Sequence, residues 1–251
     1  MRARQYRLHW LGAALAALAA LALLSAQAPA RARAGVPDLS TSVQLSNERD
    51  FTRWAYAAQV LPIREWPRPS SWLVAPVSLT TEEGLPEVYV LLRSWTDETG
   101  RVWYQVRVPM RPKERVGWVD ASAFGIAHLV TTQLVVDRRR LRATLYSAGS
   151  AVWTSPIGVG KASTPTPPGR YWIRERLRSA NPSGPYGPWA FGTSAYSRLS
   201  DWPGGGVIGI HGTDQPDLIP GRPSHGCIRL PNPAIRRLAR LMPVGTPVLI
   251  R

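Results

Sequence analysis

Apolar residues along the chain recur mostly at every second position, in short runs that turn-forming residues separate. Within residues 51–126 this alternation predicts strands at 88–92, 102–108 and 116–119, with a turn at 97–100. The short runs and frequent turns indicate an antiparallel unit. We therefore expect a small β-barrel-like domain at residues 51–126.

Residues 127–251 show the same period of two. The runs 129–136 and 141–146 flank the charged turn 137–140, which is typical of a β-hairpin. Four more strands are expected, at residues 151–158, 169–174, 207–210 and 247–250. The pattern predicts a second, larger β-rich domain at residues 127–251.

One segment near the C-terminus has helical periodicity instead. Asn232 can cap a helix and Pro233 suits its first turn, while Ile235 and Leu238 lie on one apolar face before Pro243 ends it. The chain is therefore predicted to be mainly β, with one C-terminal helix.

Residues 1–34 have the pattern of an export signal. Arginines at positions 2, 4 and 7 precede an uncharged, Leu- and Ala-rich stretch at 10–24, which is shorter than the roughly 20 residues that span a membrane. Small residues suited to cleavage follow, so we expect a secretory signal cleaved near residues 28–34, a retained anchor being the alternative. The protein is then exported to the periplasm, the cell wall or the exterior, and the polar residues 35–50 are expected to be a linker.

The net charge of +15 is unevenly distributed. Residues 35–126 contain 10 basic and 11 acidic residues, a net charge of −1, whereas residues 127–251 contain 16 basic and 5 acidic residues, a net charge of +11. A basic surface attracts polyanions. For an exported chain these are anionic cell-wall polymers or acidic lipid, and nucleic acid is not expected as a partner.

The single cysteine excludes an intrachain disulfide and points to reactive chemistry. Cys227 lies close in sequence to His211, His225 and Arg229, which can supply a base and positive potential. A thiol attacks only as the thiolate, so such neighbours favour a nucleophile. Gly226 permits a tight turn, with the amides of 226 and 227 exposed to stabilise an oxyanion.

A metal site is the alternative for this cluster. His211, His225 and Cys227 together with Asp214 or Asp217 could supply the ligands, but alternating side chains in a His-x-Cys sequence are poorly placed to bind one ion. We therefore expect neither a metal nor a cofactor.

Several motifs resemble the catalytic domain of the L,D-transpeptidase family. The principal one is Ser224–Leu230 (SHGCIRL), which Ile210–Thr213 (IHGT) precedes. The segments 158–161, 164–169 and 186–188 also fit, and the resemblance covers about 127–251. In addition, residues 103–108 and 117–119 resemble a bacterial Src-homology-3-like barrel.

This resemblance implies a peptidoglycan stem peptide as acyl donor. Cys227 would attack the carbonyl at the L-centre of the third stem residue, release D-alanine, and pass the thioester to an amine in a 3-3 cross-link, in the service of cell-wall biogenesis and cell shape. Inhibition by carbapenem-type β-lactams is expected. An L,D-carboxypeptidase that hydrolyses the same thioester and a non-catalytic cell-wall-binding protein are the alternatives.

The resemblance also implies roles for individual residues. His211 would be the general base, with its ring oriented by the Gly212 carbonyl or by Thr213, and His225 would support the site. Arg229 would hold the nucleophile loop, and Ser224 would supply loop hydrogen bonds close to the substrate. Tyr186 and Trp189 would either line the substrate cleft or serve packing.

Overall fold

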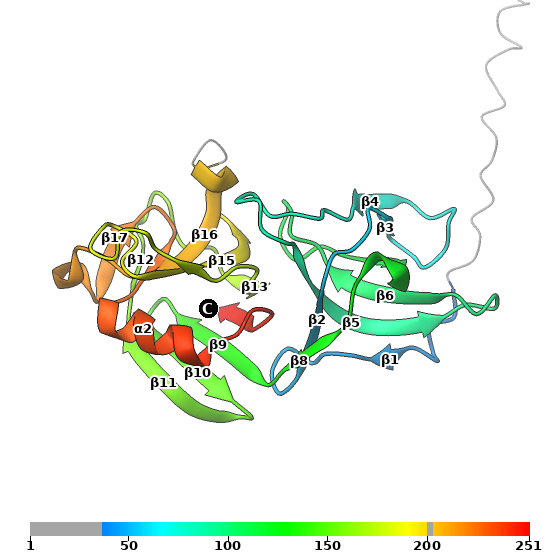
Figure 1. Cartoon of the computed structure of the whole chain (residues 1–251), viewed down its shortest axis with the longest axis horizontal. Helices are drawn as coiled ribbons and strands as arrows, with labels where there is room; N and C mark the ends of the chain where they lie inside the picture. The colour runs from blue at the N-terminus through cyan, green and yellow to red at the C-terminus, as the bar shows by residue number, and fades with distance from the viewer. Residues whose placement is uncertain (1–36, 200–202) are drawn as a thin grey trace, which may run out of the picture. The chain divides into compact units, whose positions relative to one another are not determined.

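β-Strands dominate residues 37–199 and 203–251, the parts of the chain that the computed structural model describes (Figure 1). The predicted signal peptide at residues 1–34 lies outside the described residues. The α-helix of the described part is α2, Asn232–Leu241, so a mainly β chain with a C-terminal helix is confirmed. No helix in this part is long and apolar enough to cross a membrane.

The first sheet is antiparallel and contains eight strands. Its order is β4-β3-β7-β6-β5-β2-β8, with β1 also paired to β5. These strands are β1 (Val43–Gln44), β2 (Thr52–Tyr56), β3 (Pro62–Arg64), β4 (Leu73–Pro76), β5 (Val88–Thr96), β6 (Val102–Arg107), β7 (Val116–Asp120) and β8 (His128–Val130). The strands predicted at 88–92, 102–108 and 116–119 are therefore confirmed, whereas closure into a Src-homology-3-like barrel stays a prediction.

The described part of the expected linker, residues 37–50, packs against this sheet. β1 pairs with β5, and the Ser46 hydroxyl donates to the Leu91 carbonyl over 2.5 Å. Glu48 is buried and accepts two hydrogen bonds from Arg107, at 2.6 and 2.7 Å. The linker expectation is wrong here, because polar composition concealed side chains that find specific partners in the sheet.

Two further sheets build the C-terminal half. One has the order β11-β10-β9-β19-β13 and the other β14-β15-β16-β18-β12-β17. These strands are β9 (Thr132–Asp137), β10 (Arg142–Ser147), β11 (Ser150–Pro156), β12 (Gly158–Gly160), β13 (Gly169–Trp172), β14 (Leu177–Arg178), β15 (Trp189–Tyr196), β16 (Val207–His211), β17 (Gly221–Ser224), β18 (Ile228–Arg229) and β19 (Pro247–Ile250). Short 3₁₀ turns occur at η1 (Ala121–Ala123), η2 (Pro203–Gly206) and η3 (Pro216–Leu218).

The predicted hairpin is present, with one difference at its start. β9 and β10 pair antiparallel, and Asp137 accepts hydrogen bonds from two amides of the turn. The expected strand at 129–136 is divided, since β8 pairs with β2 of the first sheet and β9 pairs with β10. The change from one sheet to the next therefore falls at Thr131, not at residue 127.

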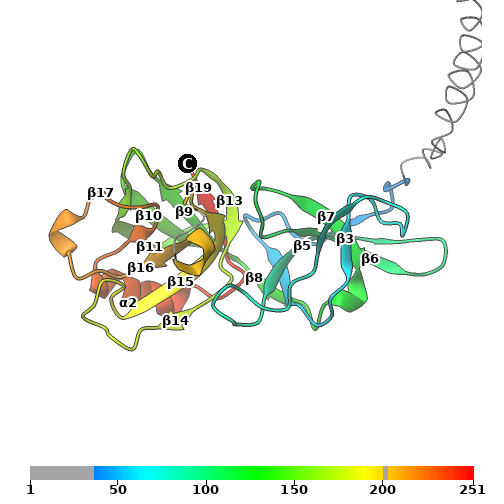
Figure 2. The same ribbon diagram turned by 90° about the horizontal axis from the view of Figure 1, so that it is seen from above.

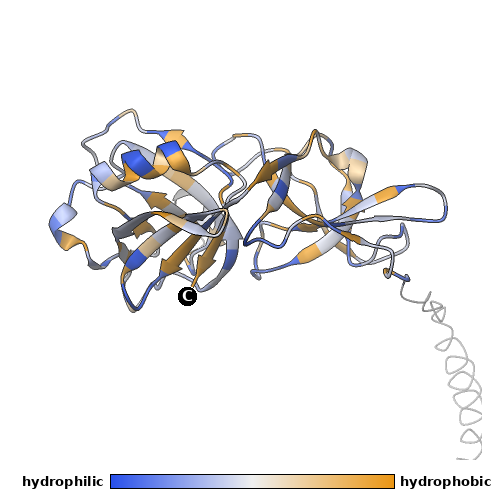
Figure 3. Cartoon of the chain, turned by 90° about the horizontal axis from the view of Figure 1, so that it is seen from below, coloured by the Kyte–Doolittle hydropathy of each residue, from blue (hydrophilic) through white to orange (hydrophobic). Residues whose placement is uncertain are grey.

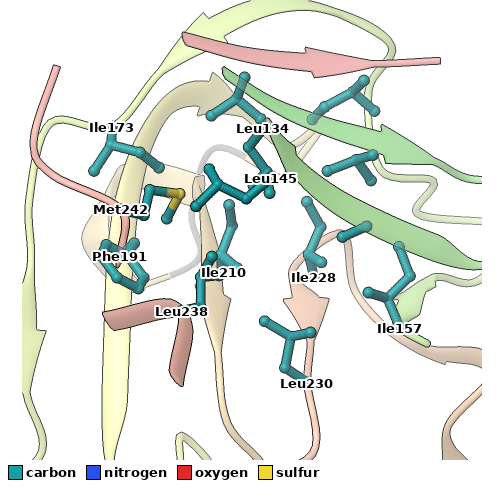
Figure 4. Packing of buried hydrophobic residues seen from close by; sticks show 14 of the residues in the cluster. Leu134, Leu145, Ile157, Ile173, Phe191, Ile210, Ile228, Leu230, Leu238 and Met242 are labelled. Carbon is teal, nitrogen blue, oxygen red and sulfur yellow. The ribbon is translucent and has the colours of Figure 1, made fainter. Parts of the chain in front are cut away.

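One hydrophobic core fills the C-terminal half. Its side chains come from both sheets and from α2, as Figure 4 shows for Leu134, Ile210 and Leu238. All three are fully buried. Burial of this area is the main driving force for folding, and it holds β16 and β18 in place beneath the site described below.

Helix α2 has the amphipathic character that the sequence predicts. Ile235, Leu238 and Ala239 are buried, whereas its arginines are exposed, and Figure 3 shows the resulting alternation of apolar and polar turns. The cap differs from the expectation, because Pro231 occupies the N-cap position and Asn232 is already helical. The Asn232 side chain instead accepts a hydrogen bond from the Thr213 amide over 2.9 Å.

Residues 37–251 form one compact unit, and a buried arginine joins its first sheet to the C-terminal half. The Arg174 guanidinium binds both carboxylate oxygens of Glu87, which lies just before β5, and is 3.0 Å from the Glu82 carboxylate. Only 3% of the Arg174 side chain and 1% of that of Glu87 are exposed. The Trp172 indole also donates to the Val88 carbonyl over 2.8 Å. Trp172 is the last residue of β13 and Val88 the first of β5, two strands that Figure 2 labels.

Replacing Arg174 with methionine is expected to lower the free energy of unfolding by about 3 kcal/mol or more, because it leaves Glu87 as an uncompensated buried charge. Urea unfolding of both proteins measures this difference. The matched control is Arg49→Gln, which removes an exposed ion pair with Asp50 and should change stability little. Equal losses in the two variants would show that the buried Arg174–Glu87 pair contributes no more to the free energy of unfolding than an exposed pair does.

Candidate active site

Cys227 lies beside the end of strand β16. Parallel pairing of β16 with β18 places Ile210 opposite Ile228 and His211 opposite Arg229, so Gly209 is level with Cys227. The Gly209 amide donates to the Cys227 sulfur over 3.4 Å. Cys227 is a half-buried free thiol. The fold therefore presents this sulfur beside two central strands of the six-stranded sheet, with one amide donor already directed at it.

His211, the last residue of β16, is 3% exposed. Its Nδ1 lies 2.6 Å from the Gly212 carbonyl oxygen, and since that oxygen only accepts, Nδ1 carries the proton. The basic lone pair is thereby left on Nε2. Burial lowers the pKa of His211 to about 4, which the Gly212 bond opposes and Arg229 reinforces. His211 is thus neutral and basic at Nε2 near neutral pH.

His211 and Cys227 open into the same cavity of about 340 Å³. Tyr186 also lines it, with its ring edge-on to His211 at 4.9 Å between ring centroids. Tyr186 is 53% exposed and lies at the mouth of the cavity. The volume is within the range of pockets that bind small ligands.

Burial raises the pKa of the Cys227 thiol, while the Gly209 hydrogen bond and Arg229 act in the opposite direction. Burial therefore outweighs the nearby positive charge of Arg229, so the resting thiol is harder to ionise than a free one. The site rests as a neutral thiol with a neutral imidazole. Deprotonation of Cys227 has to accompany attack on a substrate, with His211 as acceptor.

A hydrogen-bonded turn holds the nucleophile. The Ser224 hydroxyl donates to the Cys227 carbonyl over 2.6 Å and accepts from the Gly226 amide over 3.1 Å. Thr166 donates to the Gly226 carbonyl over 2.7 Å. Gly226 has φ +130°, and a Cβ there would lie 2.7 Å from Ile208, so glycine is required.

These bonds change the expectation for the oxyanion donors. The Gly226 amide donates to the Ser224 hydroxyl, so it is not free to donate to an oxyanion as the sequence suggested. Within the described ranges the Cys227 amide has no acceptor, and it remains the donor candidate of the pair. Ser224 is 1% exposed and does not line the cavity, so it serves the loop and does not touch a ligand there.

The second histidine points elsewhere. His225 is exposed, its Nε2 lies 3.0 Å from the Lys161 ammonium, and it is not among the cavity-lining residues. Arg229 is half-buried, donates to Gln215 over 3.1 Å and bears electrostatically on both His211 and Cys227. His225 is therefore a neighbour of the site and Arg229 its source of positive potential.

The turn after β16 is fixed from helix α2. The Gly212 amide donates to the Trp189 carbonyl over 3.2 Å, and the Thr213 amide donates to Asn232. A Cβ at Gly212 would overlap with the Asn232 side chain. Of the two orienting groups that the sequence left open, the Gly212 carbonyl is the one bonded to His211. Asn232 is a positioning residue that the sequence analysis assigned to a helix cap.

Trp189 is the first residue of β15 and packs against the core, with the Arg176 guanidinium 5.0 Å from its ring. It does not line the cavity. Of the two aromatic residues expected at the cleft, Tyr186 lies there and Trp189 serves packing.

The metal alternative has no support in the geometry. In residues 37–199 and 203–251, no group of three or more His, Cys, Asp or Glu side chains is placed to hold a metal ion.

Most residues that line the cavity were not predicted from the sequence, among them Gly209, Glu82, Glu83 and Glu175. Gly209 had a weak signal, a glycine inside an apolar strand. The glutamates had none, because Glu82 and Glu83 come from the first sheet and reach the site only through tertiary structure.

Comparison with known proteins gives consistent matches for the C-terminal half. Residues 131–250 match the family model of the L,D-transpeptidase catalytic domain, YkuD. The protein provisionally named L,D-transpeptidase YkuD in Bacillus subtilis strain 168 is 40% identical over 97 residues, which are 39% of this chain and 52% of that relative. The protein of the same name in Bacillus licheniformis is 39% identical over 115 residues, 46% and 61% of the two chains.

Among solved structures, an Enterococcus faecium L,D-transpeptidase is 30% identical, covers 48% of this chain and 49% of its own, and has a TM-score of 0.38. The chain spans about half the length of the curated relatives it matches.

Proposed function

We propose that the chain is a peptidoglycan L,D-transpeptidase that uses Cys227 as nucleophile, since residues 131–250 match the model of the L,D-transpeptidase catalytic domain. The observation that carries the proposal is the shared cavity of Cys227 and His211. A thiol with an amide donor and a neutral imidazole with a free Nε2 are the parts that acyl transfer needs.

The first half-reaction acylates the enzyme. His211 Nε2 takes the Cys227 proton as the sulfur attacks the carbonyl of the third stem residue, and the Cys227 amide stabilises the oxyanion. The C–N bond to D-alanine then breaks, with the proton returned from His211 to the leaving amine. A thioester and free D-alanine are the products.

The second half-reaction regenerates the enzyme. An acceptor amine, deprotonated by His211, attacks the thioester carbonyl, and the C–S bond breaks with return of the proton to Cys227. A stem peptide as acceptor gives a 3-3 cross-link, and water as acceptor gives the tripeptide of an L,D-carboxypeptidase. Arg229 raises the local positive potential, and Gly212 and Asn232 hold the His211 ring in its orientation.

Product analysis tests this proposal. The protein is incubated with a disaccharide tetrapeptide and the products are separated and weighed by mass spectrometry. Release of D-alanine with a cross-linked dimer is expected. Tripeptide alone would assign an L,D-carboxypeptidase, and unchanged substrate would favour a non-catalytic cell-wall-binding protein.

The rate should fall in acid only when His211 becomes protonated. Since burial lowers the pKa of His211 to about 4, the imidazole stays neutral above that value and loses its basic lone pair as pH falls through it. We expect the acid limb of kcat/KM for D-alanine release to be centred near pH 4. A limb centred near 6.5, the value of an exposed histidine, would contradict the buried base.

Export and attraction to anionic cell-wall polymers belong to the same proposal. They are supported by the pattern of residues 1–34 and by the net charge of +11 on residues 127–251. Binding to purified walls, measured as the fraction of protein that sediments with them, should therefore weaken as the salt concentration is raised. A sedimented fraction that does not change with salt would contradict the role of charge. Carbapenem-type β-lactams are proposed to acylate Cys227, because they present a strained carbonyl to the same thiol.

A further inference from the structure

Three glutamates, Glu82, Glu83 and Glu175, line the cavity of Cys227, whereas no lysine or arginine of the described chain lines it. His211 and Cys227, the other titratable groups that face inward apart from Tyr186, are neutral at rest. The lining of this cavity is thus acidic, although the chain as a whole has a net charge of +15. A concave acidic surface attracts a cationic group of its ligand.

Two of these carboxylates come from a segment that connects two strands of the first sheet. Glu82 and Glu83 lie between β4 and β5, in a segment that buried Arg174 ties to the C-terminal half through Glu87. Glu82 is itself paired with Arg174 at 3.0 Å and accepts from the Tyr196 hydroxyl at 2.5 Å. Glu83 and Glu175 form no ion pair among the described residues, so their charges are available to a ligand.

Two paired glycines, Gly192 and Gly209, lie between the Glu175 carboxylate and the Cys227 sulfur. Gly192 of β15 faces Gly209 of β16 in the antiparallel register. A Cβ at Gly209 would lie 3.8 Å from the Cys227 sulfur, and a Cβ at Gly192 would overlap with the Glu175 carboxylate. Cross-strand partners are about 5 Å apart, so along this path the Glu175 carboxylate lies at most roughly 11 Å from the sulfur, and the two glycines place no side chain between them.

This path fits the donor peptide. A four-carbon side chain that ends in an ammonium group extends about 6 Å from its Cα, and the attacked carbonyl carbon is bonded to that Cα. The contact between sulfur and carbonyl carbon at one end and the ion pair at the other account for the rest of the distance between Cys227 and the Glu175 carboxylate. An acceptor amine is a poorer match, because it has to be neutral and reach the thioester carbon itself.

Resting on the function proposed above, we propose that Glu83 and Glu175 bind the side-chain ammonium group of the residue whose carbonyl Cys227 attacks. The first sheet thereby takes part in substrate selection. Glu175 is 6% exposed, and burial raises its pKa because it disfavours the ionised carboxylate. The Thr81 side chain acts in the opposite direction and favours the ionised carboxyl. A bound cation offsets the cost of ionisation that burial imposes.

The test compares two tetrapeptides that differ only at the third residue, L-lysine or L-norleucine, which lacks the ammonium group. Release of D-alanine is measured as kcat/KM with the full chain. Wild type is expected to prefer the lysine peptide by at least about 10-fold, as for other charge-assisted hydrogen bonds. Glu83→Gln and Glu175→Gln should each reduce that preference several-fold, through the lysine peptide alone.

Glu98→Gln is the matched control, because Glu98 is an exposed glutamate in the turn between β5 and β6 and does not line this cavity. It should keep the full preference. Equal kcat/KM for both peptides in wild type, or an unchanged preference in both glutamine variants, would overturn the inference and leave the proposed function standing. A preference confined to the cross-linking step would also overturn it, by assigning the subsite to the acceptor.

Release of D-alanine from neither peptide would contradict the proposed function, and this inference with it. Thermal unfolding of Glu175→Gln is measured in parallel. If that variant is unfolded, the exposed Glu83 decides the question, since its replacement does not disturb the core.

Discussion

Replacement of Cys227 by alanine is expected to reduce D-alanine release from a tetrapeptide stem by at least about 10⁴-fold. Without the sulfur no thioester forms, and only binding and the amide donor remain to act on the carbonyl. The rate of D-alanine release by equal amounts of the two proteins measures this effect. Measurable turnover in the alanine variant at a tenth of the wild-type rate would exclude Cys227 as nucleophile.

The fold of the Cys227→Ala variant should be preserved. The thiol is half-buried, its one contact with a hydrogen-bond donor is the Gly209 amide at 3.4 Å, and the loop is held by Ser224 and Thr166 instead. The thermal unfolding midpoint therefore serves as the control. A large fall in that midpoint would mean that lost activity reports unfolding.

Replacement of His211 by glutamine is expected to lower kcat for D-alanine release by about 10³-fold, the usual size of a general-base contribution. His211 lines the cavity with Cys227, and Gly212 fixes its tautomer so that Nε2 is the basic nitrogen. Steady-state kinetics with a defined tetrapeptide measure the loss. The amide of glutamine occupies similar space but cannot accept the thiol proton.

His225→Gln is the matched control for His211→Gln. His225 is nearer in sequence to Cys227, yet it is exposed and contacts Lys161. A change of less than about 5-fold in kcat is expected for this variant. A larger loss of kcat in His225→Gln than in His211→Gln would contradict this assignment and make His225 the general base.

The sequence predicted elements whose signal is local. The β9–β10 hairpin follows from two alternating runs around a charged turn, and α2 follows from apolar residues at helical spacing before Pro243. Strand β15 was missed, because it is rich in small residues and most of it is buried, so no alternation appears. The division of 129–136 into β8 and β9 was also missed, since sheet membership is decided by partners far away in the chain.

The same distinction applies to the site. Cys227, His211 and Gly212 were identified because a short motif carries them, and the structure brings all three together. The raised pKa of the Cys227 thiol could not be predicted from the sequence, because burial is a property of the fold that no motif displays. Asn232 and the glutamates of the cavity act across 19 to more than 100 residues of sequence, so only the folded chain reveals them.

A covalent bond to the Cys227 sulfur is the feature that most directly distinguishes a nucleophile from a bystander thiol. The protein is incubated with a carbapenem, its intact mass is measured, and a proteolytic digest locates the adduct. We predict a single addition of the mass of the carbapenem, located on Cys227 and absent from Cys227→Ala. An unmodified wild-type protein, or an adduct on another residue, would contradict the assignment of Cys227 as the accessible nucleophile of this cavity.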